Sequence, residues 1–321
     1  MVVKEREFPI RIHQNKALLK RIRKNHTAIP RIESDLKKIT AGYKGEKAVD
    51  YQLGFLEEKN YSIFHNVRLK IGTQYFQIDT LIINTRYIVI IEVKNLAGII
   101  RIDPSIRQCT RILGDTQEGF IDPISQVEKL TLLFKKWLLK QGMMVPQHIE
   151  FLVVISNPQT TIEFTARPPL HSPYTRVIHA QNILHFINTL NGKYKKEVRT
   201  IKEINKMKRL IIKHHSVPET DVLDYYRIEK DEIMTGVQCE KCFAAPLPRV
   251  SNYWICSKCG IRSKNAHLPA VEDYFLLLDD VITNQKLREY LHLPSRNVAR
   301  NILSSLNLNS AGTGRGFYYF K

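Results

Sequence analysis

The stretch that decides the fold is Tyr75–Asn95, which reads YFQIDTLIINTRYIVIIEVKN. It contains two runs rich in β-branched and aromatic residues, joined by residues 84–86, a connection short enough for a hairpin. The second run, Tyr87–Val93, is apolar on both faces, which predicts a central strand covered on each side. A similar run, Tyr61–Leu69, comes before them. The three runs together predict an antiparallel meander.

A helical pattern precedes the meander. Apolar residues recur at helical spacing from Ile32 up to Gly42. A second stretch with an apolar helical face follows Gly45 and Glu46. We therefore predict a helix that runs from Gly45 to about Lys59.

Helices and a strand also follow the meander. Asp122 suits the N-cap and Pro123 the first helical position, which predicts a helix that ends at Gly142. Residues 151–156 form a short apolar run and predict another buried strand. A helix over about residues 180–190 is expected to close this domain near residue 192.

The strongest chemical signal is an acidic residue on one predicted strand and a Glu-x-Lys pair on the next. Side chains two apart on a strand share a face, so Glu92 and Lys94 point the same way, opposite to Ile91 and Val93. A tight hairpin could bring Asp79 beside Glu92. Two carboxylates on adjacent strands suit Mg²⁺ or Mn²⁺, an ion that polarises a phosphoryl oxygen and activates water. The alternative is a salt bridge between Lys94 and one of the carboxylates.

Four motifs occur in a fixed order along this part of the chain: Gly42–Glu46 (GYKGE), Gln77–Asp79 (QID), Ile91–Asn95 (IEVKN) and Asp122–Gln126 (DPISQ). They resemble the nuclease-related domain, called NERD, over about residues 38–160. The predicted order of helix, three strands, long helix and strand is that of the PD-(D/E)XK nuclease folds. The resemblance therefore implies an α/β protein with a restriction-endonuclease-like core, a mixed sheet flanked by helices.

The resemblance also implies the roles of five residues. Asp79, Glu92 and Lys94 would be the catalytic set, with Glu46 and Gln126 as supporting groups. Glu46 could complete the metal site or position water, or it could only cap a helix or form a salt bridge. Gln126 could hold Lys94 or a phosphate, or it could be a polar residue on an exposed face.

The expected function is a Mg²⁺-dependent nuclease that hydrolyses DNA phosphodiester bonds. The alternative is a non-catalytic nucleic-acid-binding or regulatory protein that retains the nuclease fold. RNA as substrate is a third possibility, although no aromatic motif of the RRM type is present. Leu130 stands where RecB-type nucleases have the tyrosine of a Gln-x-x-x-Tyr pattern, which argues against a processive, helicase-coupled role.

The charge of the chain points to a polyanionic partner. Lys and Arg number 49 against 31 Asp and Glu, a net charge of +18. Such a field captures polyanions, so DNA is the expected partner, RNA is possible, and a solvated basic surface is the alternative. No apolar run reaches the roughly 18 residues of a membrane helix, and residues 1–30 lack the apolar centre of a signal peptide. We expect a cytoplasmic protein that contacts no membrane.

Four of the five cysteines form two C-x-x-C pairs with thirteen residues between them: Cys239, Cys242, Cys256 and Cys259. Clustered pairs in a chain without an export signal indicate metal instead of disulfides. Four thiolates suit a structural Zn²⁺ site, and the spacing predicts a zinc ribbon, with an iron–sulfur centre as a minor alternative. Cys109 stands alone and is expected to be a small, partly buried apolar residue.

The C-terminal segment predicts a small DNA-binding module. A helix begins at residues 283–287, residues 292–294 form a turn, and Ser295 caps a second helix before the glycine-rich stretch 312–316. This order is typical of a winged helix-turn-helix. The second helix would then carry side chains able to contact bases and phosphates, namely Arg296, Asn297, Arg300 and Asn301. The alternative is a helical module that binds another protein.

The chain therefore divides into five predicted regions: a basic N-terminal arm (1–37), the NERD nuclease-like domain (38–192), a charged helical linker (193–235), the zinc ribbon (236–265) and the winged-helix-like module (268–321). The opening stretch up to Lys24 could be a frayed arm or a helix that touches phosphate. The charge run that begins at Lys193 could be a solvated face or a phosphate-binding ridge.

Overall fold

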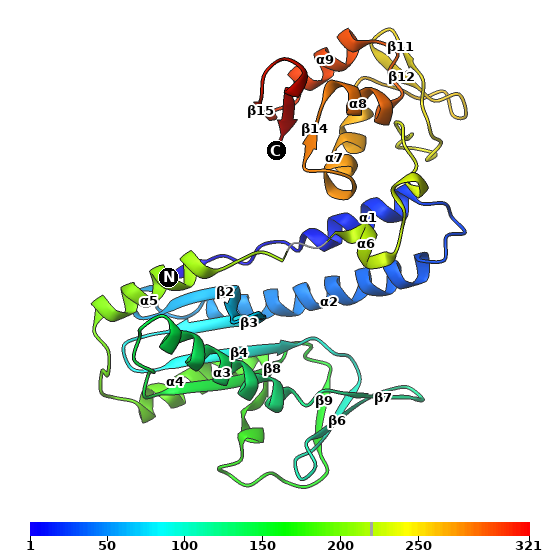
Figure 1. Cartoon of the computed structure of the whole chain (residues 1–321). Helices are drawn as coiled ribbons and strands as arrows, with labels where there is room; N and C mark the ends of the chain where they lie inside the picture. Colours follow the sequence, from blue (N-terminus) through cyan, green and yellow to red (C-terminus); the bar gives the residue numbers. More distant parts are fainter. Residues whose placement is uncertain (219–220) are drawn as a thin grey trace. The chain divides into compact units, whose positions relative to one another are not determined.

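The structure, a computed structural model, describes residues 1–218 and 221–321. The chain folds into two compact units (Figure 1). The first unit consists of Met1–Phe8 and Thr40–Pro218, and the second of Pro9–Ile39 and Glu219–Lys321. Each unit thus combines a short N-terminal segment with a later part of the chain.

A mixed six-stranded sheet forms the centre of the first unit, in the order β1-β2-β3-β4-β8-β10. Its strands are β1 (Val2–Lys4), β2 (Ser62–Ile71), β3 (Gln74–Ile83), β4 (Ile88–Lys94), β8 (Ile149–Ile155) and β10 (Val177–His179). The pairs β2–β3 and β3–β4 are antiparallel, which confirms the predicted meander. Strand β8 is parallel to both β4 and β10, and β1 is parallel to β2. The sequence predicted neither β1 nor β10, each of which is only three residues long.

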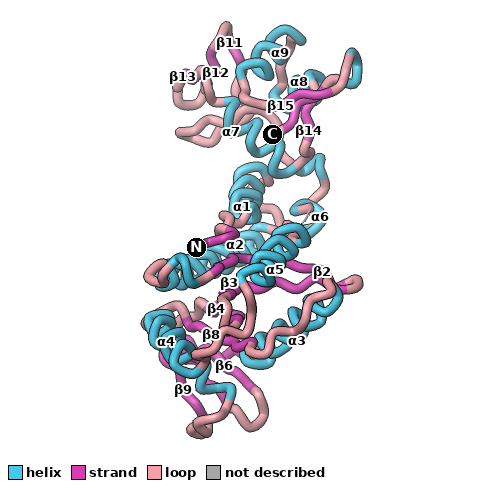
Figure 2. The backbone as a smooth tube through the Cα atoms, turned by 90° about the vertical axis from the view of Figure 1, so that its left-hand side faces the viewer, coloured by secondary structure: helices cyan, strands magenta, loops and turns pink. Residues whose placement is uncertain are grey.

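Helices cover both faces of this sheet. They are α2 (Ile29–Leu53), α3 (Pro123–Lys140), α4 (Ile183–Lys193) and α5 (Ile201–His214). In Figure 2 the strands lie between α4 on one side and α3 on the other. Helices α3 and α5 share one apolar cluster with the sheet, and α2 and α4 share another. The predicted mixed sheet flanked by helices is therefore present.

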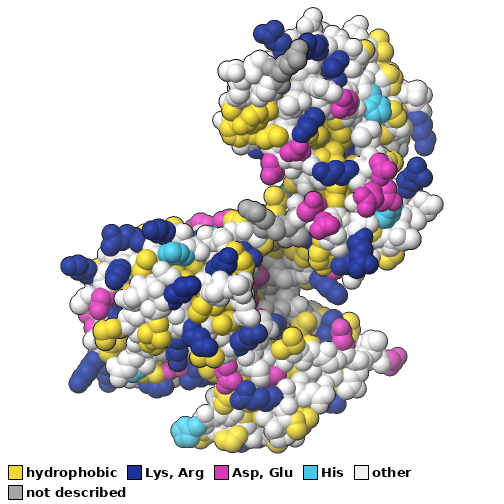
Figure 3. Space-filling view, in the orientation of Figure 1, with side chains coloured by type: hydrophobic (Ala, Val, Ile, Leu, Met, Phe, Trp, Pro, Cys, Tyr) yellow, Lys and Arg dark blue, Asp and Glu magenta, His cyan; other side chains and the backbone are white. Residues whose placement is uncertain are grey.

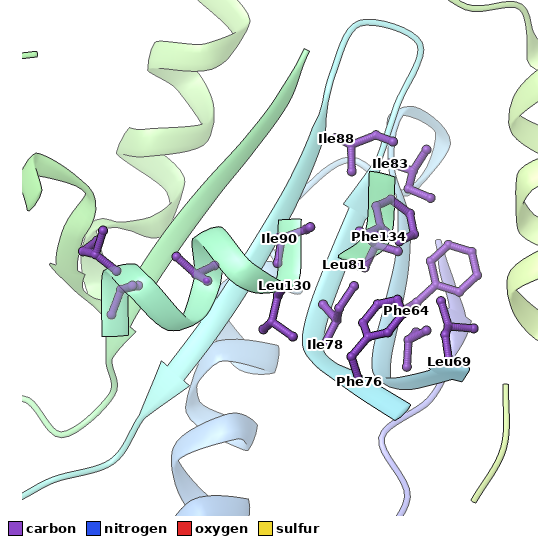
Figure 4. Packing of buried hydrophobic residues seen from close by; sticks show 14 of the residues in the cluster. Phe64, Leu69, Phe76, Ile78, Leu81, Ile83, Ile88, Ile90, Leu130 and Phe134 are labelled. Carbon is purple, nitrogen blue, oxygen red and sulfur yellow. The ribbon is translucent and has the colours of Figure 1, made fainter. Parts of the chain in front are cut away.

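Strand β4 is central because it packs into both clusters. Ile88 and Ile90 belong to the cluster of α3, whereas Val89 and Ile91 belong to that of α2. Figure 4 shows Ile90 beside Leu130 of α3. The two-faced apolar pattern of this strand follows from that position, because neither face contacts water.

Helix α2 differs from its prediction. It is one continuous helix from Ile29 to Leu53, so it passes through Gly42 and Gly45 and ends about six residues before the predicted end at Lys59. A glycine inside a helix costs about 1 kcal/mol, which a packed apolar face outweighs. The segment after the helix holds only a short 3-10 turn, Glu58–Asn60.

Gly45 lets α2 lie against the ends of two strands. A Cβ at this position would collide with Ser156 Oγ, after β8, and would lie 2.5 Å from Asn95 Cβ, after β4. The Asn95 side chain donates a hydrogen bond to the Ala41 carbonyl at 2.6 Å. This close approach brings the next residue, Glu46, to the ends of the strands. A Cβ at Gly42, by contrast, would meet no atom within 4 Å.

The start of α3 is as predicted. Asp122 is the N-cap and accepts hydrogen bonds from the backbone N–H groups of Ile124 and Ser125. Its carboxylate also accepts from the Tyr174 hydroxyl at 3.2 Å and lies 3.5 Å from the buried Cys109 thiol. These contacts fix the first turn of the helix, which carries Gln126.

A second sheet, which the sequence did not predict, lies in the first unit. Its order is β7-β6-β5-β9, and its strands are β5 (Ile99–Asp103), β6 (Gln108–Leu113), β7 (Thr116–Phe120) and β9 (Thr161–Phe164). They are four to six residues long, and left-handed residues such as Arg107 and Gly114 lie in the turns between them. Runs this short give little periodic signal in the sequence.

The second unit begins with a small helical cluster. Helix α1 (Ile10–Arg21) and the short α6 (Val222–Tyr226) pack with the first turns of α2 around Leu18, Ile32 and Leu223. Residues 10–21 of the opening stretch are thus helical, and their contact with phosphate stays a prediction. Helices α5 and α6 lie in the predicted linker, of which residues 219 and 220 fall outside the described residues.

The rest of the second unit holds two three-stranded sheets and three helices. The first sheet is β11 (Arg249–Val250), β12 (Tyr253–Ile255) and β13 (Arg262–Ser263). After α7 (His267–Leu277) come β14 (Val281–Ile282), α8 (Asn284–Leu291), α9 (Arg296–Ser305), β15 (Asn309–Ala311) and β16 (Tyr318–Phe320). Thr283 and Ser295 cap α8 and α9, which confirms the predicted starts of both helices. In the described part of the chain, no helix combines the length and the apolar character needed to cross a membrane.

The two glycines of α2 provide a matched test of this packing. Gly45→Ala should lower the free energy of unfolding by about 1–3 kcal/mol, because the added methyl group overpacks the contact with Asn95 and Ser156. Gly42→Ala should raise it by about 0.5–1 kcal/mol, because alanine restricts the unfolded chain and meets open space in the helix. Urea unfolding measures both. Equal effects of the two substitutions would contradict the close approach at Gly45.

Candidate functional site

Two carboxylates and a lysine meet where β3 and β4 run side by side. The pairing of Thr80 with Ile91, continued by one residue, places Asp79 opposite Glu92. Asp79 Oδ2 accepts a hydrogen bond from the Val93 N–H at 2.9 Å. Lys94 Nζ donates to Glu92 Oε1 at 2.8 Å. The hairpin therefore brings the three side chains into one cluster.

Gln126 reaches this cluster from the first turn of α3. Its Oε1 accepts a hydrogen bond from Lys94 Nζ at 2.8 Å, and its Nε2 donates to Glu92 Oε1. The amide therefore bridges both residues of the Glu-x-Lys pair. Of the alternatives for Gln126, contact with Lys94 is the one that the geometry shows.

Glu46 approaches from α2. Its carboxylate accepts a hydrogen bond from Asn66 Nδ2 at 3.3 Å and forms an ion pair with Arg6. The negative charge of Asp79 helps to raise the pKa of Glu46, and the charge of Glu46 helps to raise the pKa of Glu92. The five side chains singled out by the sequence thus converge from α2, β3, β4 and α3.

The surroundings of the cluster disfavour ionisation of its carboxyl groups. The pKa of Asp79 is raised to about 7, first by burial and second by the charge of Glu92. Burial also raises the pKa of Glu92 and of Glu46, although Lys94 and Arg6 oppose the shift. The cluster thus holds three carboxyls with raised pKa values. Their oxygen atoms are the hard donors that Mg²⁺ or Mn²⁺ would take, so the residues fit such an ion.

Arg6 is a residue of the site that sequence reasoning missed. Its side chain is almost fully buried, and its guanidinium pairs with the carboxylates of Glu46 and Asp50. It also donates to Asn66 Oδ1, to Thr80 Oγ1 and to the backbone oxygen of Asp79, at 2.9–3.2 Å. Arg6 lies in a basic stretch without a motif, 73 residues before Asp79, so no local pattern revealed its partners.

The four clustered cysteines meet in the second unit. Their sulfur atoms all lie within 4.8 Å of one another, and the closest pairs are Cys239–Cys259 at 3.5 Å and Cys242–Cys256 at 3.4 Å. The pKa of the Cys239 thiol is lowered to about 6, chiefly by the backbone N–H of Cys242. The cluster could bind zinc, because thiolates held by backbone N–H groups are its usual ligands.

The two cysteine pairs have the same backbone conformation. The N–H of Cys239 donates to the Ala244 carbonyl, and the N–H of Cys256 donates to the Ile261 carbonyl. In each pair the residue after the second cysteine, Phe243 or Gly260, is left-handed, with φ of 57° and 73°. Such turns point two thiols toward one place, which supports a single four-thiolate site over four independent thiols.

The predicted DNA-contacting residues lie together on α9. Ala299, Ile302 and Leu303 form the buried face of this helix. Its exposed residues include Arg296, Asn297, Arg300 and Asn301. All four side chains are therefore free to meet a partner, and their role in binding DNA stays a prediction.

Helix α5 presents the predicted charge run to solvent. Ile204, Met207 and Ile211 are buried against the sheet, whereas the exposed side chains include Lys202, Lys206, Arg209 and Lys213. Lys and Arg side chains are spread over the face that Figure 3 shows, α5 included. Phosphate binding by this face stays a prediction.

The comparison with protein families bears on the first unit. Residues 41–156 match the family model of the nuclease-related domain. The chain contains a NERD domain. All four motifs quoted above lie within the matched residues, so the resemblance seen in the sequence is confirmed, whereas Arg6 lies outside them. No curated protein and no solved structure matched the chain.

Removal of the Arg6 side chain should destabilise the NERD domain. Arg6→Ala removes the guanidinium that pairs with Glu46 and Asp50 in a largely buried place, which costs about 3 kcal/mol in the free energy of unfolding, although Lys47 still pairs with Asp50 at 3.6 Å. Arg6→Lys should restore part of this loss, because it returns the charge without the planar set of donors. Arg101→Ala is the control, because that arginine pairs with Glu163 on the surface, where ion pairs contribute less than about 1 kcal/mol. If urea unfolding shows that Arg6→Ala lowers the free energy of unfolding no more than the control does, this role is contradicted.

Zinc should be bound by the second unit alone. We expect metal analysis of the purified protein to find zinc, and Cys242→Ser to lose it. Cys109→Ser, a change of the fifth cysteine, should retain the metal, because Cys109 lies in the core of the first unit. A strong chelator should increase the exposure of Trp254, which is buried in the same apolar cluster as Cys239 and Cys256. Retention of zinc by Cys242→Ser would overturn the assignment.

Proposed function

We propose that the NERD domain of this protein is a metal-dependent nuclease that hydrolyses DNA phosphodiester bonds. The observation that carries the proposal is the convergence of Asp79, Glu92, Lys94 and Gln126 on one place at the sheet, with Glu46 beside them. The raised pKa values of the three carboxyls support a site for a divalent cation. The family of the domain supports nuclease chemistry.

Asp79 and Glu92 would hold Mg²⁺ or Mn²⁺. Such an ion, when bound, neutralises charge on a phosphoryl oxygen and lowers the pKa of water. Both carboxylates must be ionised for this purpose, and the hydrogen bond from the Val93 N–H to Asp79 favours that form. Glu46 would either complete the set of oxygen ligands or accept a hydrogen bond from the attacking water.

Lys94 is placed to act on the phosphate or on the water. An ammonium group has three N–H donors, and Glu92 and Gln126 accept two of them. The third is left for a phosphoryl oxygen or for the attacking water. Gln126 holds both residues of the Glu-x-Lys pair, so its role is to fix the direction of that third donor.

The second unit would supply binding. We propose that the four cysteines hold a structural zinc ion in a zinc ribbon, which has no part in cleavage because four thiolates leave no open position. The helix pair α8–α9 and the hairpin β15–β16 would act as a winged-helix-like module. Its α9 would contact DNA through Arg296, Asn297, Arg300 and Asn301.

A second candidate function is nucleic-acid binding without cleavage. One observation favours it: Lys94 pairs with Glu92, and Arg6 pairs with Glu46, so cations of the chain itself neutralise part of the acidic cluster. A domain of this kind would bind DNA with a steep salt dependence and would leave it intact.

Cleavage assays separate the two functions. Wild-type protein, incubated with circular DNA, linear DNA or RNA, should cut DNA in Mg²⁺ or Mn²⁺ and not in EDTA. Asp79→Asn and Lys94→Ala should each reduce the rate at least about 100-fold, because each removes charge stabilisation from the transition state. Because the pKa of Asp79 is raised to about 7 and metal binding needs its ionised form, the rate at low Mg²⁺ should rise with pH through that value.

Glu163→Gln, a change of a partly exposed carboxylate on β9 that lies outside the cluster, serves as the control and should cut like wild type. Cleavage that persists unchanged in Asp79→Asn would exclude the proposed site. Binding of DNA without cleavage in either metal would favour the second function.

A further inference from the structure

The hairpin β2–β3 has one buried face and one exposed polar face. Val67, Leu69, Phe76 and Ile78 point into the core, as Figure 4 shows for Leu69, Phe76 and Ile78. The alternate positions point to the other side. Arg68 pairs with Gln77 across the strands, and Lys70 pairs with Tyr75. We refer to these four residues as the hairpin face: Arg68, Lys70, Tyr75 and Gln77.

The hairpin face carries two cations that no carboxylate neutralises. The Arg68 guanidinium lies 3.7 Å from the centroid of the Tyr75 ring, and Lys70 Nζ lies 5.2 Å from it. Arg68 donates to the Ser216 hydroxyl at 3.1 Å. Among the described residues, neither Arg68 nor Lys70 has a carboxylate within salt-bridge distance. Lys70 is exposed and Arg68 is half-buried, so the Lys70 ammonium and part of the Arg68 side chain are open to a ligand.

Arg6 shows how different the hairpin cations are. The guanidinium of Arg6 is buried and contacts two carboxylates, so its charge is neutralised inside the fold. Lys70 is exposed, and Arg68 rests on an aromatic ring that is itself 46% exposed. Stability does not require two unpaired cations around an exposed tyrosine, whereas binding of an anion would use them.

The hairpin face is continuous with the candidate site. Gln77 precedes Asp79 by two residues on β3, and its Nε2 lies 3.5 Å from Asn66 Oδ1. Asn66 Nδ2 in turn donates to Glu46. A chain of polar contacts therefore leads from the acidic cluster through Asn66 and Gln77 to the cations. A ligand that extends from the cluster along the hairpin would reach Arg68, Lys70 and Tyr75.

We propose that the hairpin face binds the single-stranded part of the nucleic acid on one side of the scissile phosphate. Arg68 and Lys70 contact phosphates, and Tyr75 stacks on a base. Residues two apart on a strand lie about 7 Å apart, which spaces the two charges for successive phosphates instead of one anion. An exposed aromatic ring accepts any unpaired base, whereas a duplex offers only paired edges. The proposal rests on the proposed function, because it gives that site its substrate.

Binding without cleavage tests the proposal directly. The full chain, in EDTA, is titrated against a fluorescent single-stranded oligonucleotide at several salt concentrations. Tyr75→Ala should weaken binding about tenfold, because a stacked base is lost. Lys70→Ala and Arg68→Ala should each reduce the slope of log affinity against log salt by about 0.7, the value for one lost phosphate contact on a single strand.

Lys136→Ala is the matched control, because it removes the charge of an exposed lysine on α3, outside the hairpin. It should change neither the affinity nor the salt slope. Thermal melting of each variant checks that the fold is intact. Hairpin variants that melt like wild type and still bind the oligonucleotide like wild type would overturn the proposal, and so would a larger loss for duplex than for single-stranded DNA.

A small substrate separates this proposal from the nuclease assignment. Bis(p-nitrophenyl) phosphate is a diester too short to reach the hairpin, so Tyr75→Ala and Lys70→Ala should raise KM for DNA by a larger factor than they change the Mg²⁺-dependent hydrolysis of this diester. If wild type binds the oligonucleotide, the hairpin variants do not, and nothing is hydrolysed, the hairpin proposal stands and the nuclease function fails. If hydrolysis is normal and binding is insensitive to the hairpin, only the hairpin proposal fails.

Discussion

The burial of Asp79, Glu92 and Glu46 near one another is the constraint on which the rest of the candidate site depends. Carboxyl groups that are buried and close together ionise only if cations or hydrogen-bond donors compensate them. The chain provides Lys94 for Glu92, Arg6 for Glu46 and the Val93 N–H for Asp79. These partners leave the pKa of all three carboxyls raised. The compensation is therefore partial.

Several features of the fold serve to bring these groups together. The absence of a side chain at Gly45 allows α2 to approach the strand ends, and that approach carries Glu46 to the cluster. The Asp122 cap fixes the first turn of α3, and Gln126 follows from it. The site is thus made by the positions of two helix segments relative to a hairpin, and each position has an identifiable local cause.

The positive charge of the chain has more than one use. Arg6 is buried and holds carboxylates of the NERD domain, so it contributes to the fold and not to an external field. Arg68 and Lys70 lie on the hairpin without acidic partners in the part of the chain that the structure describes, and the arginines of α9 are exposed. A net charge of +18 by itself does not distinguish these cases. These cases are distinguished by the burial of each cation and by the identity of its partner.

The sequence by itself determined the local features of this protein. The alternation and apolar runs from Tyr61 to Val93 gave the meander, Asp122-Pro123 gave the start of α3, and C-x-x-C spacing gave the cysteine cluster. The motifs around Asp79 and Glu92 gave the family. Each of these signals is carried by residues that are near in sequence, so the pattern and its cause lie in the same few positions.

Only the tertiary structure decided what depends on distant segments. The strands β1 and β10 and the second sheet gave no periodic signal in the sequence, because strands of three to six residues owe their form to the neighbours with which they pair. The end of α2 at Leu53 was not predicted either. The role of Arg6 was hidden for the same reason, since its partners come from α2, β2 and β3. Long-range packing and the burial of charge are properties of the folded chain, and no short stretch of sequence contains both sides of such a contact.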